Sequence, residues 1–358
     1  NTTGVHNQAV GMYALNANTT ASHNTAMGYN ALGVNTTGAS NVAVGNYALD
    51  ANTTAANNVA VGYAALSANT TGSQNVSVGN ASLTVNTTGA NNVAVGQNAL
   101  NANTTAGSNT AIGINAMLVN TTGSVCTAVG AFALDANTTG TNNVGIGTNA
   151  GSAITTGTYN ACLGTNSGVA ITTASFNTVI GNLAGDSITT GANNTVMGLS
   201  AGAGVTTGIG NVCLGHTAGD GITTGSYNVT IGQGSEPSAV AAAQQITIGT
   251  VNIVGKGDST GFISAAGGPM YNGQNSTVWV ATSDRRIKKD IVPNTKGLAA
   301  INQIEPKNFY YKSDEELQEE MPGAQEGLPL NKLTTSAIAQ ELDLIFPEAI
   351  ERRGEHDI

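Results

Sequence analysis

Apolar and polar residues recur along residues 1–238 with a period of 17 residues, because this segment consists of fourteen copies of one unit. The unit follows the pattern Asn-Thr-Thr-Gly-x-x-Asn-x-Ala-Val-Gly-x-x-Ala-Leu-x-Ala, and its positions are numbered here from Asn1. The tenth position is always apolar, from Val10 to Ile231. An apolar residue at one place in every unit indicates a core that is built by stacking successive units.

Each unit predicts one short β-strand. The Asn-x-Ala-Val stretch contains a β-branched residue and lies between turn-forming residues. Gly fills the eleventh position in all fourteen units, from Gly11 to Gly232, which indicates a corner with positive φ or a close backbone approach. Thr-Thr-Gly predicts a second short extended piece that ends at another corner. Gly, Asn and two Thr at fixed places disfavour a helix.

Asparagine fills the seventh position in thirteen units, with Cys126 as the exception. Stacked Asn side chains predict an amide ladder in which each side chain bonds to its copies above and below. The Asn of Asn-Thr-Thr, as in Asn18, also completes a glycosylation acceptor sequence. Tight stacking leaves little room for a sugar on every coil, so we expect a turn-forming Asn there.

The large apolar residue at position 15 changes place along the repeat. In the first eight units it is Leu or Met, as in Leu15 and Leu134, and the next unit starts with Asn. From Gly151 onward position 15 is Gly, or Glu236 in the last unit, and the next unit starts with Ile or Val, as in Ile154. Such compensation indicates that both positions fill one interior volume, and it predicts two shaft segments with differently packed corners.

These patterns predict a mainly β chain with a β-solenoid or β-roll shaft over residues 1–238. A single coil of this size has a thin core and its Ala-rich strand needs a cover, so we expect three chains to pack around one axis. The unit is similar to the head repeat of trimeric bacterial adhesins, which is a trimeric β-roll; the matching residues are, for example, 41–45. Residues 239–282 form a β transition or distal tip region, with short strands expected at 245–249, 251–255 and 277–281.

Charge divides the chain near Ser283. Only 9% of all residues are charged, against about 25% in ordinary domains. Before Ser283 there are one basic residue, Lys256, and six acidic residues, whereas the other ten basic and fifteen acidic residues lie after Ser283. A shaft almost without Lys or Arg cannot neutralise phosphates, so nucleic-acid binding is not expected. No apolar run approaches the roughly 20 residues that span a bilayer, so membrane insertion is not expected either.

Other candidate chemistry in the repeat is weak. Cys126, Cys162 and Cys213 have no CxxC spacing, which favours small buried fillers over a disulfide framework or a zinc site. The four His residues are scattered and suggest no ligand set. Calcium-binding β-roll repeats need recurrent Asp, which this repeat unit lacks. We therefore expect no metal and no cofactor. Adjacent Thr residues would face opposite sides of a strand, which disfavours ice binding, and the spread of the acids over separate coils disfavours a paired-carboxylate glycosidase.

From Ser283 the pattern predicts a small α/β domain over residues 283–358. Helices are expected at 296–304 and 336–346, the second ended by Pro347. The aromatic segment 308–312 predicts a strand. The acidic stretch that follows it contains Pro-Gly and predicts an exposed loop.

Three motifs in this domain occur in a particular order. They are Ser-Asp-Arg-Arg-Ile-Lys-Lys-Asp-Ile at 283–291, Tyr-Tyr-Lys at 310–312, and Ile-Ala-Gln-Glu-Leu at 338–342 followed by Phe-Pro-Glu. Together they resemble the self-cleaving intramolecular chaperone domain at the C-terminus of phage tail spikes and fibres, first described on endosialidases. The resemblance implies that the domain trimerises, aligns three chains in register and is then released. Members of that family continue into a long helix, so the domain is expected to be incomplete at Ile358.

The same resemblance implies Ser283 as the nucleophile of the self-cleavage and Lys288 as its base. A Lys with a lowered pKa can activate a Ser without a His. The Ser-x-x-x-x-Lys spacing alone is common, and Arg285 and Arg286 also fit a basic turn. Whether the bond before or after Ser283 is cut stays open.

We therefore expect the structural shaft of a phage tail fibre or spike, located in the virion as a homotrimer with other tail proteins as partners. Its only expected enzymatic activity is a single-turnover serine-peptidase cleavage of its own chain. A host cell-surface glycan or receptor is a further candidate partner, with residues 239–282 as the candidate region. The alternative is the stalk of a trimeric adhesin on a bacterial surface. Since similar units specify register weakly, a removable chaperone would align the chains before the stack forms.

Overall fold

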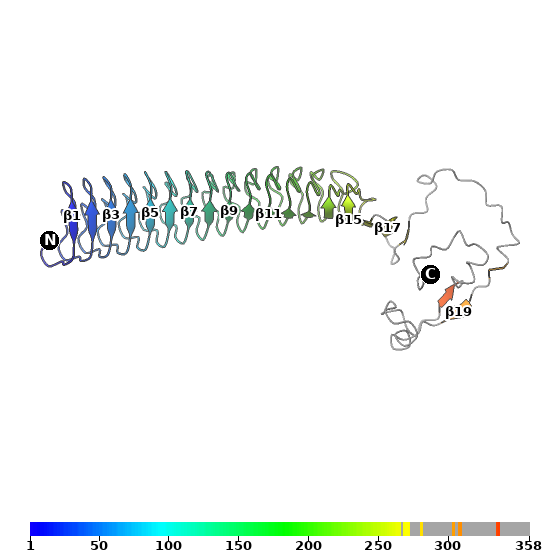
Figure 1. Cartoon of the computed structure of the whole chain (residues 1–358), viewed down its shortest axis with the longest axis horizontal. Helices are drawn as coiled ribbons and strands as arrows, with labels where there is room; N and C mark the ends of the chain where they lie inside the picture. The colour runs from blue at the N-terminus through cyan, green and yellow to red at the C-terminus, as the bar shows by residue number, and fades with distance from the viewer. Residues whose placement is uncertain (266–267, 273–279, 282–302, 305–306, 310–333, 337–358) are drawn as a thin grey trace, which may run out of the picture. The chain divides into compact units, whose positions relative to one another are not determined.

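A computed structural model describes residues 1–265, 268–272, 280–281, 303–304, 307–309 and 334–336. The chain divides into two compact units, Asn1–Thr282 and Ser283–Ile358, and each is described by itself. The first unit is a stack of coils in which every coil contributes one short strand (Figure 1).

In the described part of the compact unit Asn1–Thr282, eighteen strands form one sheet. They are β1 (Gln8–Val10), β2 (Thr25–Met27), β3 (Val42–Val44), β4 (Val59–Val61), β5 (Val76–Val78), β6 (Val93–Val95), β7 (Thr110–Ile112), β8 (Thr127–Val129), β9 (Val144–Ile146), β10 (Ala161–Leu163), β11 (Thr178–Ile180), β12 (Thr195–Met197), β13 (Val212–Leu214), β14 (Val229–Gln233), β15 (Ile246–Val251), β16 (Gly261–Ala265), β17 (Gly268–Asn272) and β18 (Val280–Ala281). The predicted strand at positions 8 to 10 is thus confirmed. The predicted extended piece at Thr-Thr-Gly is wrong, because these residues form a bend in every coil.

Each strand pairs in parallel with the strand one unit further along the chain. Val42 is opposite Val59, for example, and the same spacing continues to Val229 opposite Ile246. The parallel ladder therefore extends by another coil into the region predicted as a β transition. There β15 contains nearly all of the strand expected at 245–249 but only the first residue of the strand expected at 251–255. In the rest of that second stretch, Val254 forms an isolated bridge with Glu236.

The end of this sheet changes direction. Strand β16 still pairs in parallel with β15, but β17 pairs antiparallel with β16, and β18 pairs antiparallel with β17. Strand β18 lies inside the predicted strand 277–281. The antiparallel strands thus complete the sheet of the first unit immediately before the candidate cleavage region.

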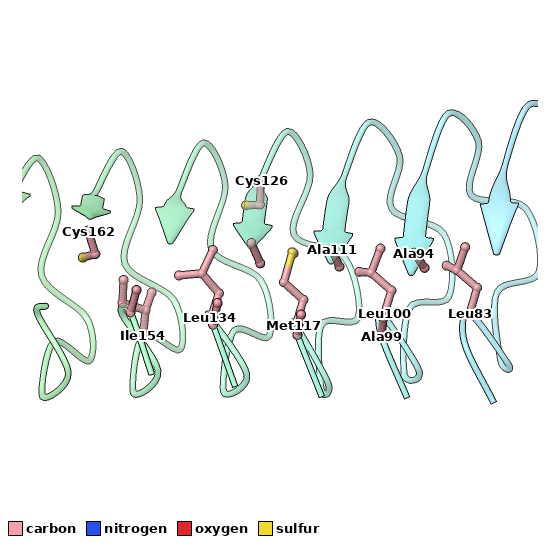
Figure 2. Packing of buried hydrophobic residues seen from close by; sticks show 14 of the residues in the cluster. Leu83, Ala94, Ala99, Leu100, Ala111, Met117, Cys126, Leu134, Ile154 and Cys162 are labelled. Carbon is pink, nitrogen blue, oxygen red and sulfur yellow. The ribbon is translucent and has the colours of Figure 1, made fainter. Parts of the chain in front are cut away.

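The core lies inside each coil of one chain. Position 9 of the strand and position 15 of the following turn point toward each other, as Ala94 and Leu100 do in Figure 2. Both side chains are fully buried. The inward-facing Ala side chains of the strand are therefore covered by their own coil, without any contribution from a partner chain. The always apolar position 10 is not part of this core, since it points outward.

The two predicted packing segments are confirmed. Leu134 fills the interior from position 15, whereas Ile154 fills it from the start of the next unit, and both are fully buried. A Cβ added to Gly151 would lie 2.9 Å from Cδ1 of Ile154 and 3.0 Å from Cδ2 of Leu134. One interior volume therefore cannot hold a side chain from both positions.

Two columns of buried Asn side chains connect the coils. At position 1 the amides bond directly to each other, with Asn35 Nδ2 donating to Asn18 Oδ1 at 3.1 Å. At position 7, Asn41 Nδ2 donates to the Ala55 carbonyl, and Asn24 Oδ1 accepts the Asn41 backbone amide. The predicted position-7 ladder is therefore a side chain to backbone ladder in the first coils. The buried Asn18 amide is engaged in the stack, which agrees with the turn-forming interpretation.

The glycine corner after each strand has both predicted properties. The φ angle at position 11 lies between 112° and 140° in every unit. A Cβ on Gly45 would lie 2.3 Å from the carbonyl oxygen of Gly62 in the next coil. Any side chain here would therefore both strain the backbone and separate the coils.

In the second unit, β19 (Lys307–Phe309) pairs antiparallel with β20 (Thr334–Ser336). The first residues of the predicted strand 308–312 are thus in a strand. Ser336 ends a strand, although it was predicted to begin a helix. Gln303 lies in a turn at the end of the predicted helix 296–304. The remainder of both predicted helices and the predicted acidic loop lie outside the described residues.

Candidate self-cleavage site and chemistry of the shaft

The two candidate catalytic residues, Ser283 and Lys288, lie outside the described residues. The described strand that precedes them in the sequence is β18, in which Val280 is paired with Tyr271 and Ala281 with Met270. The strand ends at Ala281, two residues before Ser283. The candidate cleavage region therefore follows directly on a segment that belongs to the sheet of the first unit.

The three cysteines are buried and free, as predicted. Burial raises the pKa of the Cys162 thiol to about 12 and that of the Cys213 thiol to about 11. Burial also raises the pKa of Cys126. A thiol must ionise to act as a nucleophile or a metal ligand, so these three groups are suited to filling the interior.

One pair of neighbouring carboxyl groups was not predicted from the sequence. Glu236 lies beside Asp220, and the Gly221 amide donates to Glu236 Oε2 at 3.1 Å. Burial, followed by the hydrogen bond with Asp220 and the charge of that residue, raises the pKa of Glu236 to about 8. The two residues are about one unit apart in the sequence, so the repeat period itself could have indicated that stacking brings them together.

The aspartates of the repeat occupy one column. Asp50, Asp135, Asp186 and Asp220 all stand at position 16 of their units. Burial raises the pKa of Asp50 and Asp135. The negative charge of the stacked coils is thus concentrated on one line along the shaft.

Tyrosines form a file on the first coils. The rings of Tyr13, Tyr29, Tyr47 and Tyr63 pack edge to face, with centroids 5.3 to 5.9 Å apart. Such pairs contribute about 0.5–1.5 kcal/mol each beyond the area they bury. The file therefore stabilises the contact between neighbouring coils at this end of the described chain.

Other classes of site find no support in the described part of the chain. No cluster of three or more His, Cys, Asp or Glu side chains there could hold a metal ion. Among the same residues, no helix has the length and apolarity that a membrane crossing requires.

Comparison with known proteins identifies the C-terminal segment. Residues 283–351 match the model of the family Peptidase_S74, described as chaperone of endosialidase. No curated protein shows significant similarity to the chain. The family match confirms the resemblance drawn from the motifs at 283–291, 310–312 and 338–342. Residues 283–351 are therefore similar to the endosialidase chaperone domain, and in the sequence they follow a parallel β-solenoid that is consistent with the shaft of a tail fibre or tail spike.

Proposed function

We propose that this chain forms the shaft of a phage tail fibre or tail spike as a homotrimer, aligned by its C-terminal chaperone domain and then freed from it by self-cleavage. The observation that carries the proposal is the family match at residues 283–351, directly after a long stack of near-identical coils. In the virion the expected partners are other tail proteins and a host cell-surface glycan or receptor.

The regularity of the shaft explains why a chaperone is useful. Val42 pairs with Val59 in the same way as Val59 pairs with Val76, and this equivalence recurs along the stack. Because each chain forms its own coils, the alignment at risk is the one between chains. A displacement of one chain by one coil would lose contacts only at the ends, so a separate trimerising domain would supply the missing register.

Self-cleavage would then remove the chaperone. In this mechanism Lys288 accepts the hydroxyl proton of Ser283, and the Ser283 oxygen attacks the carbonyl carbon of an adjacent peptide bond. The amine of that bond leaves with a proton, and water hydrolyses the resulting ester. Loss of the domain that guided assembly would leave the shaft kinetically hard to unfold.

Denaturing electrophoresis of the full chain tests the cleavage. The wild type should give a large fragment that carries the shaft and a small fragment that carries the chaperone. Ser283→Ala and Lys288→Met should each give one intact chain, because either change removes a reacting group. Lys289→Met is the matched control and should still be cleaved. Cleavage that survives Ser283→Ala, or an intact wild-type chain, would contradict the proposed mechanism.

A bacterial adhesin stalk is the second candidate function. It is favoured by the likeness of Asn41–Gly45 to the adhesin head repeat. Immunogold labelling with an antibody against the shaft separates the two functions, since it would decorate phage tails in one case and the bacterial surface in the other.

A further inference from the structure

The strands of the shaft expose the same two positions in every coil. In β3, for instance, Ala43 is buried while Val42 and Val44 on either side of it are partly exposed. The same alternation occurs in the other strands from β2 to β14. Positions 8 and 10 therefore line one continuous outer strand face, which we define by these two positions of units one to fourteen.

This outer strand face is apolar although it faces outward. Position 10 is Val, Ile, Leu or Met in all fourteen units, and position 8 is Val, Thr or Ala in all but the first. The exposed fraction is 40% for Ile112 and 45% for Met197, for example. Position 6, which is exposed elsewhere on the coil, varies from His23 to Ser40 and Gln74. Fourteen copies of one unit have thus diverged at position 6 while position 10 stayed apolar.

Neither the coil interior nor the glycine corner explains this restriction. The interior is filled by positions 9 and 15, or by positions 9 and 1 in the later coils. The corner depends on the backbone of position 11. Contiguous exposed apolar surface of this extent is typical of a protein interface.

We propose that the outer strand face is the surface by which three copies of this chain pack around a common axis, each coil against the same coil of its partners. The inference rests on the homotrimer of the proposed function and assigns the contact within it. A partner for this face must repeat once per coil, at the roughly 4.8 Å spacing of adjacent strands. A second copy of the chain satisfies that condition along the whole face.

The distribution of charge favours this arrangement. Positions 8 and 10 contain no charged residue in any of the fourteen units, whereas the four Asp residues of the repeat all stand at position 16. Copies of the chain can therefore meet through the outer strand face without bringing like charges together there.

The symmetry follows from the alignment of the chains. Chains that share a chaperone at the same end run parallel, and a rotation axis along the shaft places identical positions at the same level, close together where they face the axis. Val61 of one chain would then face the outer strand face of its partners at the level of their own Val61. This equivalence makes the proposal testable with single positions.

The first experiment compares two double variants of the full chain in the same two coils. Val78→Lys with Val95→Lys places charge on the outer strand face, while Thr71→Lys with Thr88→Lys places it at exposed position 3. By sedimentation velocity, the wild type and the Thr variant should have the mass of three chains. The Val variant should fall to one chain, with a circular dichroism spectrum that still shows β structure.

The second experiment uses milder substitutions. Val61→Cys should form interchain disulfides under oxidation, seen as a doubled mass on a nonreducing gel, whereas the control Thr71→Cys should not. The native thiols of Cys126, Cys162 and Cys213 are buried and should therefore form no interchain disulfide. If the wild type is a trimer but Val61→Cys does not crosslink and the Val variant stays trimeric, the assigned surface is wrong. If the wild type is a monomer, the proposed homotrimer itself fails.

Discussion

The first eight coils and the later coils of the shaft solve one packing problem in two ways. In the first segment Leu100 enters the interior from position 15, and in the second Ile188 enters it from position 1. The backbone at position 15 is nevertheless the same, with φ of 50° at Leu100 and 51° at Gly185. Leu in this left-handed region costs roughly 1 kcal/mol or more, which Gly avoids. The later coils thus keep the same backbone path. Gly at position 15 relieves the backbone strain there, and the side chain at position 1 fills the interior instead.

The hydrogen-bonded columns change at the same place. Where position 1 is Asn, as in Asn52, its amide bonds to the copy in the previous coil. Where Ile takes that position, the ladder moves to position 7, and Asn194 Nδ2 donates to Asn177 Oδ1 at 3.2 Å. Apolar filling and amide ladder therefore change together, which indicates that a coil tolerates either set as long as both the volume and the polar groups are satisfied.

The largest expected effect comes from breaking the filling in the first segment. Leu66→Gly removes a fully buried side chain and should destabilise the shaft by about 3–5 kcal/mol, somewhat reduced by the relief of the left-handed backbone. Adding Asn69→Ile refills the volume in the manner of the second segment and should recover about 2 kcal/mol. Denaturant-induced unfolding, followed by circular dichroism, measures both.

The position of the exchange sharpens this test. Leu134→Gly with Asn137→Ile would move the boundary between the segments by only one coil, since the next coil already has Ile154. Because Asn137 is the last amide of the position-1 column, this double variant should lose less stability than the pair at Leu66 and Asn69. Equal losses at both places, or no recovery by Asn69→Ile, would show that the two fillings are not interchangeable.

The period, the strand, the glycine corner and the exchange between Leu134 and Ile154 could all be predicted from the sequence, because each is a local pattern repeated many times. Which face of the strand points into the core could not be predicted. Ala43 and Val44 are both apolar, and alternation alone does not say which of the two points inward. The answer depends on the space left by Leu49, which only the folded coil defines. The proximity of Asp220 and Glu236 arises from stacking, so the 17-residue period could have indicated it although the local sequence could not.

A smaller, stabilising effect is expected at Cys126, which interrupts the position-7 column. In other coils the Asn Oδ1 accepts the backbone amide of the next copy, as Asn143 Oδ1 does from Asn160 at 3.0 Å. Cys126→Asn would provide such an acceptor for the Asn143 amide and a better donor to the Gly140 carbonyl, now 3.4 Å from the thiol. We expect a gain of about 1 kcal/mol in the free energy of unfolding.

The matched control for this variant is Cys162→Asn, which changes the same residue type at position 9. That side chain points into the apolar interior and is fully buried. An amide placed there without partners should destabilise the shaft by roughly 1–3 kcal/mol. Thermal unfolding of both variants beside the wild type compares them, and a loss of stability in Cys126→Asn would contradict the role assigned to the column.

The smallest effect concerns the last unit, where Glu236 replaces the Gly of the second segment. Its pKa in the folded chain is raised to about 8, from 4.5 in an ordinary glutamic acid, by burial and by Asp220. Between these values the folded chain holds a proton that the unfolded chain has released, so stability falls as pH rises from 4.5 to 8. Below pH 4.5 both states are protonated and the penalty vanishes.

Two variants test this pH dependence. Glu236→Gln should flatten it, while Asp186→Asn, in the acidic column three units earlier, should retain it. Hydrogen exchange of the β14 amides at pH 5 and pH 8, corrected for the intrinsic exchange rate, reports on this local stability. Equal protection at both pH values in the wild type would show that Glu236 is ionised in the fold and that the last unit does not differ from its neighbours in this respect.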